Sequence, residues 1–171
     1  QGQPLYMEIN SDDLEQDFPA IIKTYAEKFV AEGEVSIIKT DDKKCCFTGH
    51  RPNKFSFGYN EGHPDCVRLK SLLRDEIKAV INDDYSHFIS GGALGVDQWA
   101  IEILLELKKQ YPHVRIEVAL PCIGQDNKWP AKSKERYRKL LEQADIVTYV
   151  STESYKLYLM LKRDEYMVDI S

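Results

Sequence analysis

Glycine, arginine and small polar residues follow four short apolar runs of the sequence, at the points where the runs end. The first run ends in Thr48-Gly49-His50-Arg51-Pro52, and the second ends in residues 90–97. The third is followed by Pro121-Cys122-Ile123-Gly124-Gln125, and the fourth by Ser151-Thr152. In open α/β sheets, ligands bind outside the carboxyl ends of the strands, where loops and helix N-termini converge. These residues therefore predict one ligand site shared by four strand ends.

The segment Ser90-Gly91-Gly92-Ala93-Leu94-Gly95-Val96-Asp97 is the sharpest of these features. Gly91 and Gly92 remove side chains where a strand turns into a helix, so backbone N–H groups can approach an anion closely. The spacing of Ser90, Gly92 and Gly95 resembles G-x-G-x-x-G with serine in the first place. The third strand ends in Leu120-Pro121, however, without the acid that binds a ribose hydroxyl in dinucleotide sites. The pattern fits a phosphate cradle or a tight strand–helix turn, and it disfavours NAD as a hydride cofactor.

Asp97 and Arg51 each allow two interpretations. Asp97 falls in the first turns of a predicted helix, where a carboxylate favours the helix dipole. It can instead accept a hydrogen bond from a ligand hydroxyl or from the neighbouring loop of His50. Arg51 is either the exposed residue of a Gly-Pro turn or a bidentate phosphate ligand, as guanidinium geometry favours. Because Arg51 shares its sheet edge with the glycines of residues 90–97, phosphate binding is the better prediction.

The elements that must position these residues alternate along the chain from Lys44 onward. Predicted strands cover residues 45–48, 85–90, 114–120 and 146–150, and predicted helices cover residues 65–82, 93–110, 131–143 and 153–168. This alternation implies parallel strands joined by right-handed crossovers, and continuous apolar strands imply a sheet covered on both faces. We therefore predict an α/β fold, a Rossmann-like three-layer sandwich with a mainly parallel sheet.

Two of the predicted helices have unusual composition. The basic residues of the third helix are expected to form a solvated face; they are Lys132, Lys134, Arg136, Arg138 and Lys139. The last helix is so apolar over residues 157–161 that we expect it to be largely buried.

The first 43 residues are predicted to form an N-terminal appendage of helix and strand, ahead of a sheet domain of residues 44–171. Residues 5–9 and 35–38 fit short strands. Between them, Asp17 caps a predicted helix that runs to Ala31, with Pro19 in its first turn. The apolar residues of this helix form one stripe, so the helix is expected to pack on another surface; they are Phe18, Ile21, Ile22, Tyr25 and Phe29.

Composition restricts the class of protein. The 171 residues are 43% hydrophobic and 30% charged, as in an ordinary globular domain. No apolar run approaches the roughly 18–20 residues of a membrane span, so we expect no membrane association. The net charge of −5 makes nucleic acid an unfavourable partner. The four cysteines lack metal-ligand spacing and suit a reducing cytoplasm, so we expect a cytoplasmic protein with no metal and no cofactor.

Four motifs taken in order resemble one known family. They are Phe47-Thr48-Gly49-His50-Arg51-Pro52, the glycine-rich segment of residues 90–97, Ala119-Leu120-Pro121, and Arg163-Asp164-x-x-Met167-Val168-Asp169. Over residues 44–171 the chain resembles the YpsA/YoqJ-like branch of the SLOG superfamily. Members of this superfamily are Rossmann-like and include the Lonely-Guy phosphoribohydrolases and the nucleotide-binding domain of DNA-processing protein A.

The resemblance implies a nucleotide-derived ligand, a nucleoside phosphate or an ADP-ribose-like molecule, held on the strand ends. Gly49, His50 and Arg51 would form one wall of the site, residues 90–97 the phosphate cradle, and Arg163 would approach from the last helix. Asp164 stands where this branch usually shows Asn. The expected ligand-binding residues are Thr48, Gly49, His50, Arg51, Ser90, Gly91, Gly92, Ala93, Gly95, Asp97, Pro121 and Arg163.

The sequence has no counterpart of the last strand and second Gly-Gly-Thr loop of the family, near which the phosphoribohydrolases carry a catalytic Glu. The leading hypothesis is thus a sensor or ligand-binding module, with no catalytic residue. The alternatives are an N-glycosidic hydrolase of the phosphoribohydrolase type, a single-stranded DNA binder and a protein-interaction domain with a vestigial site. A sheet that stops one strand early exposes an edge. We expect a homodimer, strand exchange or the N-terminal segment to cover it.

Overall fold

The computed structural model describes residues 8–9 and 43–171, and these residues contain one five-stranded sheet of order β1-β5-β4-β3-β2. Strands β2 (Lys43–Phe47), β3 (Tyr85–Ser90), β4 (Arg115–Leu120) and β5 (Ile146–Tyr149) are parallel to one another. The short β1 (Glu8–Ile9) pairs antiparallel with β5. The predicted mainly parallel sheet is confirmed.

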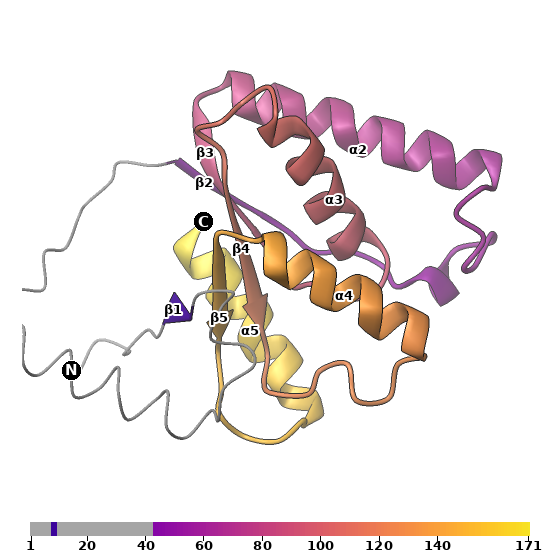
Figure 1. Cartoon of the computed structure of the whole chain (residues 1–171), viewed down its shortest axis with the longest axis vertical. Coiled ribbons are helices and arrows are strands. Elements are labelled where there is room, and N and C mark those ends of the chain that lie inside the picture. The colour runs from indigo at the N-terminus through magenta and orange to yellow at the C-terminus, as the bar shows by residue number, and fades with distance from the viewer. Residues whose placement is uncertain (1–7, 10–42) are drawn as a thin grey trace, which may run out of the picture.

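Helices cover both faces of this sheet (Figure 1). α2 (Pro64–Asn82), α3 (Val96–Lys108) and α4 (Ala131–Gln143) connect successive parallel strands and pack side by side. Because each connection advances by one strand in the same direction, right-handed crossovers place all three helices on one face. α5 (Leu157–Ile170) contacts β2 and β4 from the other face. The three-layer sandwich is confirmed, and its two helical layers are unequal.

The larger core lies between the sheet and α2, α3 and α4. Along β4, Ile116, Val118 and Leu120 point into this core, whereas Ala119 belongs to a smaller core beneath α5. Successive strand residues face opposite sides, so one strand supplies both cores. Ile89 of β3 and Met167 of α5 complete the smaller core. Side chains thus pack against both faces of the sheet, and the carboxyl ends of its parallel strands lie along one edge.

Local signals set where the helices begin. Nδ1 of His63 accepts a hydrogen bond of 3.2 Å from the Asp65 N–H, and Pro64 occupies the first turn of α2. α3 begins at Val96 rather than at the predicted Ala93. The reason is Gly95, whose φ of 100° lies outside the helical region and is accessible only to glycine without strain. A loop therefore separates β3 from α3.

The prediction that the last helix is largely buried is wrong. α5 begins at Leu157, and the Leu157 and Leu161 side chains are 78% and 67% exposed. Its buried side carries Leu159, Arg163 and Met167. The helix is apolar on two opposite sides, and the sheet covers only one of them.

The structure describes only part of the N-terminal segment for which the sequence predicts a helix and two strands. Residues 8–9 of the predicted strand 5–9 form β1, at the edge of β5. The predicted helix of residues 17–31 and the predicted strand of residues 35–38 lie outside the described residues. No helix in the described part of the chain has the length and apolar character needed to cross a membrane.

Candidate functional site

The ends of β2 and β3 meet at Asp97, in the first turn of α3. The Asp97 side chain is 2% exposed. Its Oδ1 accepts a 3.2 Å hydrogen bond from the Gly49 N–H, and its Oδ2 accepts one of 3.3 Å from the Ala93 N–H. Ser90 Oγ donates to the Asp97 carbonyl oxygen at 3.0 Å. Asp97 therefore joins the loop of His50 to the glycine loop, which is one of the two roles that its position in the sequence suggests.

Arg163 reaches the same point from α5 on the opposite face of the sheet. Its Nη1 donates to the Gly91 carbonyl oxygen at 2.9 Å and lies 3.8 Å from Asp97 Oδ2. Its Nε and Nη2 lie 2.9 Å and 2.8 Å from Asp164 Oδ1. Arg163 is 5% exposed, and a buried guanidinium requires paired charges and satisfied donors. Asp97, Asp164 and the Gly91 carbonyl oxygen supply them.

The ionisation of Asp97 is strongly affected by its surroundings. Burial raises the pKa of this carboxyl to about 6, although the Arg163 charge and the Ala93 and Gly49 N–H groups act in the opposite direction. A carboxyl group with such a perturbed pKa, placed at the ligand-binding edge of an α/β sheet, is a candidate functional residue.

Glycine is required at position 91 by the close approach of two side chains. A Cβ atom there would lie 2.1 Å from Arg163 Nη1 and 2.7 Å from Asp97 Oδ2. Both atoms belong to buried side chains that are already hydrogen-bonded, so neither can withdraw without losing those partners. Gly91 thus leaves space for the Arg163 guanidinium and the Asp97 carboxylate, in addition to the close approach of backbone that the sequence suggests.

The remaining predicted residues lie at different depths. Thr48, His50 and Arg51 are exposed at the end of β2, and the described residues contain no ion pair of Arg51. The His50 carbonyl oxygen accepts from the Val96 N–H at 3.4 Å. Gly92 and Gly95 are buried within the loop, and Pro121 is buried directly after β4. The structure therefore divides the predicted set into a buried cluster and an exposed rim.

Two glutamines support the glycine loop: Gln98, which the sequence analysis missed, and Gln125, which it named only as part of the loop after the third strand. Gln98 Nε2 donates to the Gly92 carbonyl oxygen at 3.1 Å, and Gln125 Nε2 donates to the Gly91 carbonyl oxygen at 3.2 Å. Both side chains are at least 95% buried. Among the described residues, neither Oε1 atom has a hydrogen-bond partner. In the sequence, only their positions directly after Asp97 and directly after Gly124 could have indicated this role.

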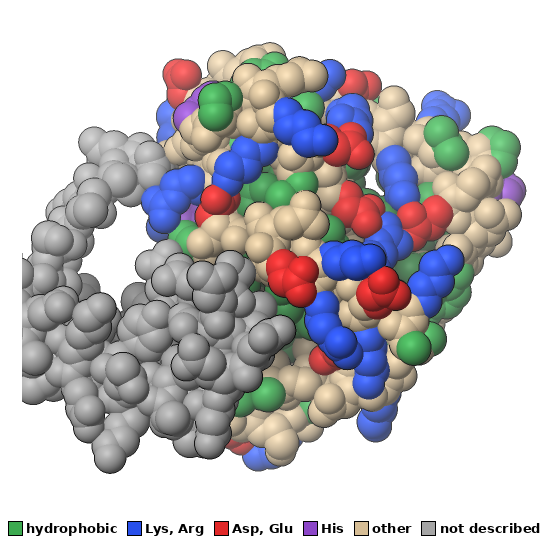
Figure 2. Space-filling view, viewed as in Figure 1, with side chains coloured by type: hydrophobic (Ala, Val, Ile, Leu, Met, Phe, Trp, Pro, Cys, Tyr) green, Lys and Arg blue, Asp and Glu red, His purple; other side chains and the backbone are tan. Residues whose placement is uncertain are grey.

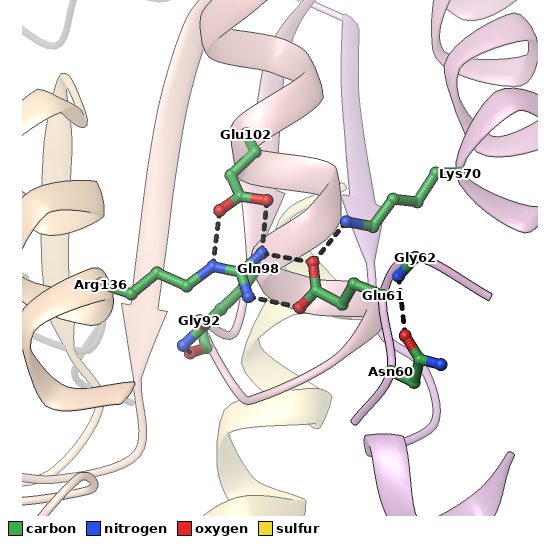
Figure 3. Close-up of polar contacts among 8 residues, drawn as sticks. All are labelled: Asn60, Glu61, Gly62, Lys70, Gly92, Gln98, Glu102 and Arg136. Atoms are coloured by element: carbon green, nitrogen blue, oxygen red, sulfur yellow. Dashed lines mark hydrogen bonds and ion pairs between the residues drawn. The ribbon is translucent and has the colours of Figure 1, made fainter. Parts of the chain in front are cut away.

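A second polar cluster, the Glu61 network, consists of Glu61, Lys70, Glu102 and Arg136 (Figure 3). Arg136 of α4 donates from Nε and Nη2 to the two carboxylate oxygens of Glu102, both at 2.6 Å. It also donates to Glu61, which accepts a 2.5 Å hydrogen bond from Lys70 of α2. Arg136 is thus a partly buried member of the predicted basic face, on which Lys132, Arg138 and Lys139 are exposed. The network holds the loop after Arg51 against α2, α3 and α4.

The Glu61 carboxylate differs from that of Asp97 in its ionisation. Partial burial alone would raise its pKa, but the hydrogen bonds from Arg136 and Lys70 outweigh burial and lower the pKa to about 2. The Glu61 and Arg136 side chains are about one-third exposed, at 33% and 32%. Glu61 thus stays charged at physiological pH.

Two cavities lie outside the buried cluster. One of about 1040 Å³ runs between α3 and α4, where Leu105 and Leu140 lie among acidic and basic side chains. Figure 2 shows this face, with red and blue side chains intermixed. Another of about 450 Å³ lies at the ends of β4 and β5, beside Tyr137 and Tyr149. Asp97 and Arg163 line neither cavity.

A third group of polar residues is buried between the sheet and α5. Glu117 Oε1 accepts hydrogen bonds from Thr148 Oγ1 at 2.7 Å and from the Tyr166 hydroxyl at 2.9 Å. His87 Nε2 lies 2.9 Å from Glu117 Oε2. Burial would raise the pKa of Glu117, but these three partners hold it below its ordinary value. In the described part of the chain, no group of His, Cys, Asp and Glu side chains has the arrangement of a metal site.

The parallel sheet, its crossover helices and the glycine loop after β3 define a Rossmann-like domain. Residues 45–171 match the family model described as the YspA SLOG family, named YpsA, and the chain belongs to this family. The family predicted from the four motifs is therefore confirmed.

Three bacterial relatives show the extent of the similarity. The chain is 29% identical over 130 residues to a UPF0398 protein of Brevibacillus brevis, covering 75% of this chain and 69% of the relative. It is 26% identical over 122 residues to a UPF0398 protein of Lysinibacillus sphaericus, covering 71% and 68%. With a UPF0398 protein of Bacillus thuringiensis, the identity is 31% over 114 residues, covering 67% and 61%. These names state no activity.

Proposed function

We propose that the chain binds a nucleotide-derived small molecule, a nucleoside phosphate or an ADP-ribose-like molecule, at the carboxyl edge of its sheet. In this proposal it is a sensor or ligand-binding module. The observation that carries it is the convergence of Asp97 and Arg163, two buried charged side chains from opposite faces, on Gly91 at the end of β3. Buried charges placed at the usual ligand edge of an α/β sheet support a binding role.

The phosphate would bind on the exposed rim. The Asp97 carboxylate already accepts the Ala93 and Gly49 N–H groups, so it occupies the anion position inside the loop. Arg51 is exposed beside it and has no ion pair among the described residues, and a guanidinium can bind phosphate through two parallel hydrogen bonds. The N-terminus of α3 adds favourable potential for a negative charge.

The sugar or base would be recognised by acceptors beneath the rim. The Oε1 atoms of Gln98 and Gln125 flank the glycine loop and have no hydrogen-bond partner in the described part of the chain, and a buried acceptor without a donor is costly. Because both side chains are at least 95% buried, a ligand hydroxyl or amino group would supply a donor only when the glycine loop moves aside. In this arrangement Asp97 and Arg163 position the loop, and Arg51 contacts the ligand.

Isothermal titration against AMP, ADP-ribose, NAD, cyclic nucleotides and ribose 5-phosphate tests the proposal. We expect at least one phosphate-bearing ligand to bind, and Arg51→Ala to weaken that binding by about tenfold or more, because a hydrogen bond to a charged group is lost. Arg68→Ala, an exposed arginine of α2, is the matched control and leaves binding unchanged. No binding across the panel, or equal binding by the Arg51→Ala variant, contradicts the proposal.

Two further measurements separate the alternatives. Release of free base from AMP, lost in a His50→Ala/Arg51→Ala variant, would identify an N-glycosidic hydrolase in place of a binding module. Salt-dependent retardation of a single-stranded oligonucleotide would identify a DNA binder, since phosphate contacts make such binding sensitive to salt. For a sensor or binding module, we expect neither result.

A further inference from the structure

The outward side of α5 carries a stripe of large apolar side chains, the α5 stripe, formed by Leu157, Leu161 and Val168. These side chains are 78%, 67% and 61% exposed. Their spacings of four and seven residues place them on the same side of the helix. The opposite side of α5 packs on the sheet through Leu159 and Met167. Contacts with the described residues therefore do not explain the α5 stripe.

The α5 stripe continues toward the carboxyl edge of the sheet. Tyr158 and Tyr155 are 49% and 42% exposed, and Ile123 is 42% exposed. A parallel β-bridge joins Ile123 to Ser154, which brings the loop after β4 next to the segment before α5. Single exposed apolar residues are common on protein surfaces, whereas a continuous apolar patch marks an interaction surface. Leu157, Tyr158 and Leu161 fit the second description, and Asp164, which is paired with Arg163, separates them from Val168.

The charges beside the α5 stripe identify the partner that it fits. Lys156 lies directly before α5 and pairs with Glu153, and Lys162 lies in the amino-terminal half of the helix, whereas Glu165 and Asp169 lie in its carboxyl-terminal half. A second α5 helix in antiparallel orientation would place the partner's Glu165 and the partner's Asp169 beside these lysines. The surface is thus complementary to itself about a two-fold axis, which is the symmetry of most homodimers.

We propose that the α5 stripe is the interface of a homodimer in which the α5 helices of two copies pack antiparallel across a two-fold axis. Leucine and valine side chains of both copies form the apolar centre, and lysine–carboxylate pairs form its polar rim, the usual anatomy of a protein interface. Antiparallel helices also align their dipoles favourably. This proposal does not depend on nucleotide binding, because the α5 stripe and Arg163 lie on different sides of the helix.

Sedimentation velocity and light scattering of the full chain test the interface. We expect the wild type to have twice the monomer mass of 19.8 kDa. Leu161→Glu places a charge at the apolar centre, and we expect it to weaken association by about 100-fold or more. Leu72→Glu is the matched control, because Leu72 is 53% exposed on α2, on the other face of the sheet. We expect this variant to remain a dimer, and circular dichroism verifies that both variants are folded.

Charge reversal tests the orientation of the helices. Lys162→Glu and Glu165→Lys should each weaken self-association by about tenfold, because each places like charges together across the axis. An equimolar mixture of the two variants should recover a mixed dimer through the reversed pairs. A monomeric wild type, including one whose α5 stripe is covered by residues 10–42 of the same chain, overturns the proposal. So does a dimer that survives Leu161→Glu, or a mixture that recovers no association.

Discussion

Two arginines of this chain, Arg163 and Arg136, each meet two carboxylates at very different depths. The Arg163 side chain is 6% exposed and that of its partner Asp97 is 2% exposed. Arg136 and its partners Glu61 and Glu102 are each about one-third exposed, at 32%, 33% and 32%. Water can therefore replace a lost partner in the Glu61 network, whereas it cannot reach Asp97. An arginine–carboxylate pair is thus expected to contribute much to the free energy of unfolding at Asp97 and Arg163, and little in the Glu61 network.

The pKa values of the carboxyl groups in the two regions are shifted in opposite directions. At Asp97 burial dominates and raises the pKa to about 6, whereas at Glu61 the hydrogen bonds dominate and lower it to about 2. The charged form of Asp97 is therefore less stable in the fold than in water, and that of Glu61 is more stable. Folding disfavours the charged form of Asp97. A perturbed carboxyl group of this kind is typical of a functional site, and this supports the carboxyl edge as the binding region.

The largest effect is expected for Arg163→Met. This change leaves the Asp97 carboxylate buried without its counter-charge and removes the hydrogen bond to the Gly91 carbonyl oxygen. Loss of one partner of a buried ion pair costs about 3–5 kcal/mol. Urea unfolding at neutral pH measures the loss in the free energy of unfolding. The double variant Arg163→Met/Asp97→Asn should recover part of it, and a loss below about 1 kcal/mol would show that Asp97 is not isolated from water.

How far the sequence predicts these regions depends on the range of the interactions. The strand ends, the glycine loop and the place of Asp97 follow from short motifs, because glycines and a helix start specify local backbone. The approach of Arg163 followed only from the family resemblance. Gln125 lies 34 residues from its acceptor Gly91, and Arg136 lies 75 residues from Glu61. Such contacts depend on how α3, α4 and the loops pack, which one-dimensional patterns do not specify.

The exposure of α5 shows a second limit of sequence patterns. An apolar run such as residues 157–161 predicts burial without saying what covers it. The sheet face holds α5 through Leu159, Arg163 and Met167 and leaves the α5 stripe outward. Only the arrangement of layers reveals that one side of the helix has no cover among the described residues.

The pH dependence of stability should separate the two carboxylates by sign. The folded-state pKa of Asp97 is about 6 against an ordinary value of 3.8, so the folded state binds this proton more tightly. The stability that Asp97 contributes is fully present below about pH 3.8 and is lost as the pH rises through about 6, by up to about 3 kcal/mol. For Glu61, a folded-state pKa of about 2 against 4.5 reverses the sign. Its contribution is present above about pH 4.5 and is lost as the pH falls toward 2.

Urea unfolding across this pH range, with Asp97→Asn and Glu61→Gln as references, measures both contributions. Subtracting each variant from the wild type removes the titration of all other groups. Relative to Asp97→Asn, the wild type should become more stable as the pH falls from about 6 to about 3.8. Relative to Glu61→Gln, it should become less stable below about pH 4.5. If the difference in the free energy of unfolding changed with pH in the same direction for both comparisons, Asp97 and Glu61 would not have opposite pKa shifts.

The smallest effect is expected for Arg136→Met. This change removes the bidentate pair with Glu102 and the hydrogen bonds to Glu61, but both carboxylates remain accessible to water. Partly exposed ion pairs contribute about 1 kcal/mol or less, and salt screens them. We expect a loss of about 1 kcal/mol in urea unfolding, decreasing at about 1 M salt, whereas the loss for Arg163→Met is unchanged by salt. A loss as large as that for Arg163→Met would mean that packing of Arg136 between α3 and α4, rather than exposure, decides the strength of the Glu61 network.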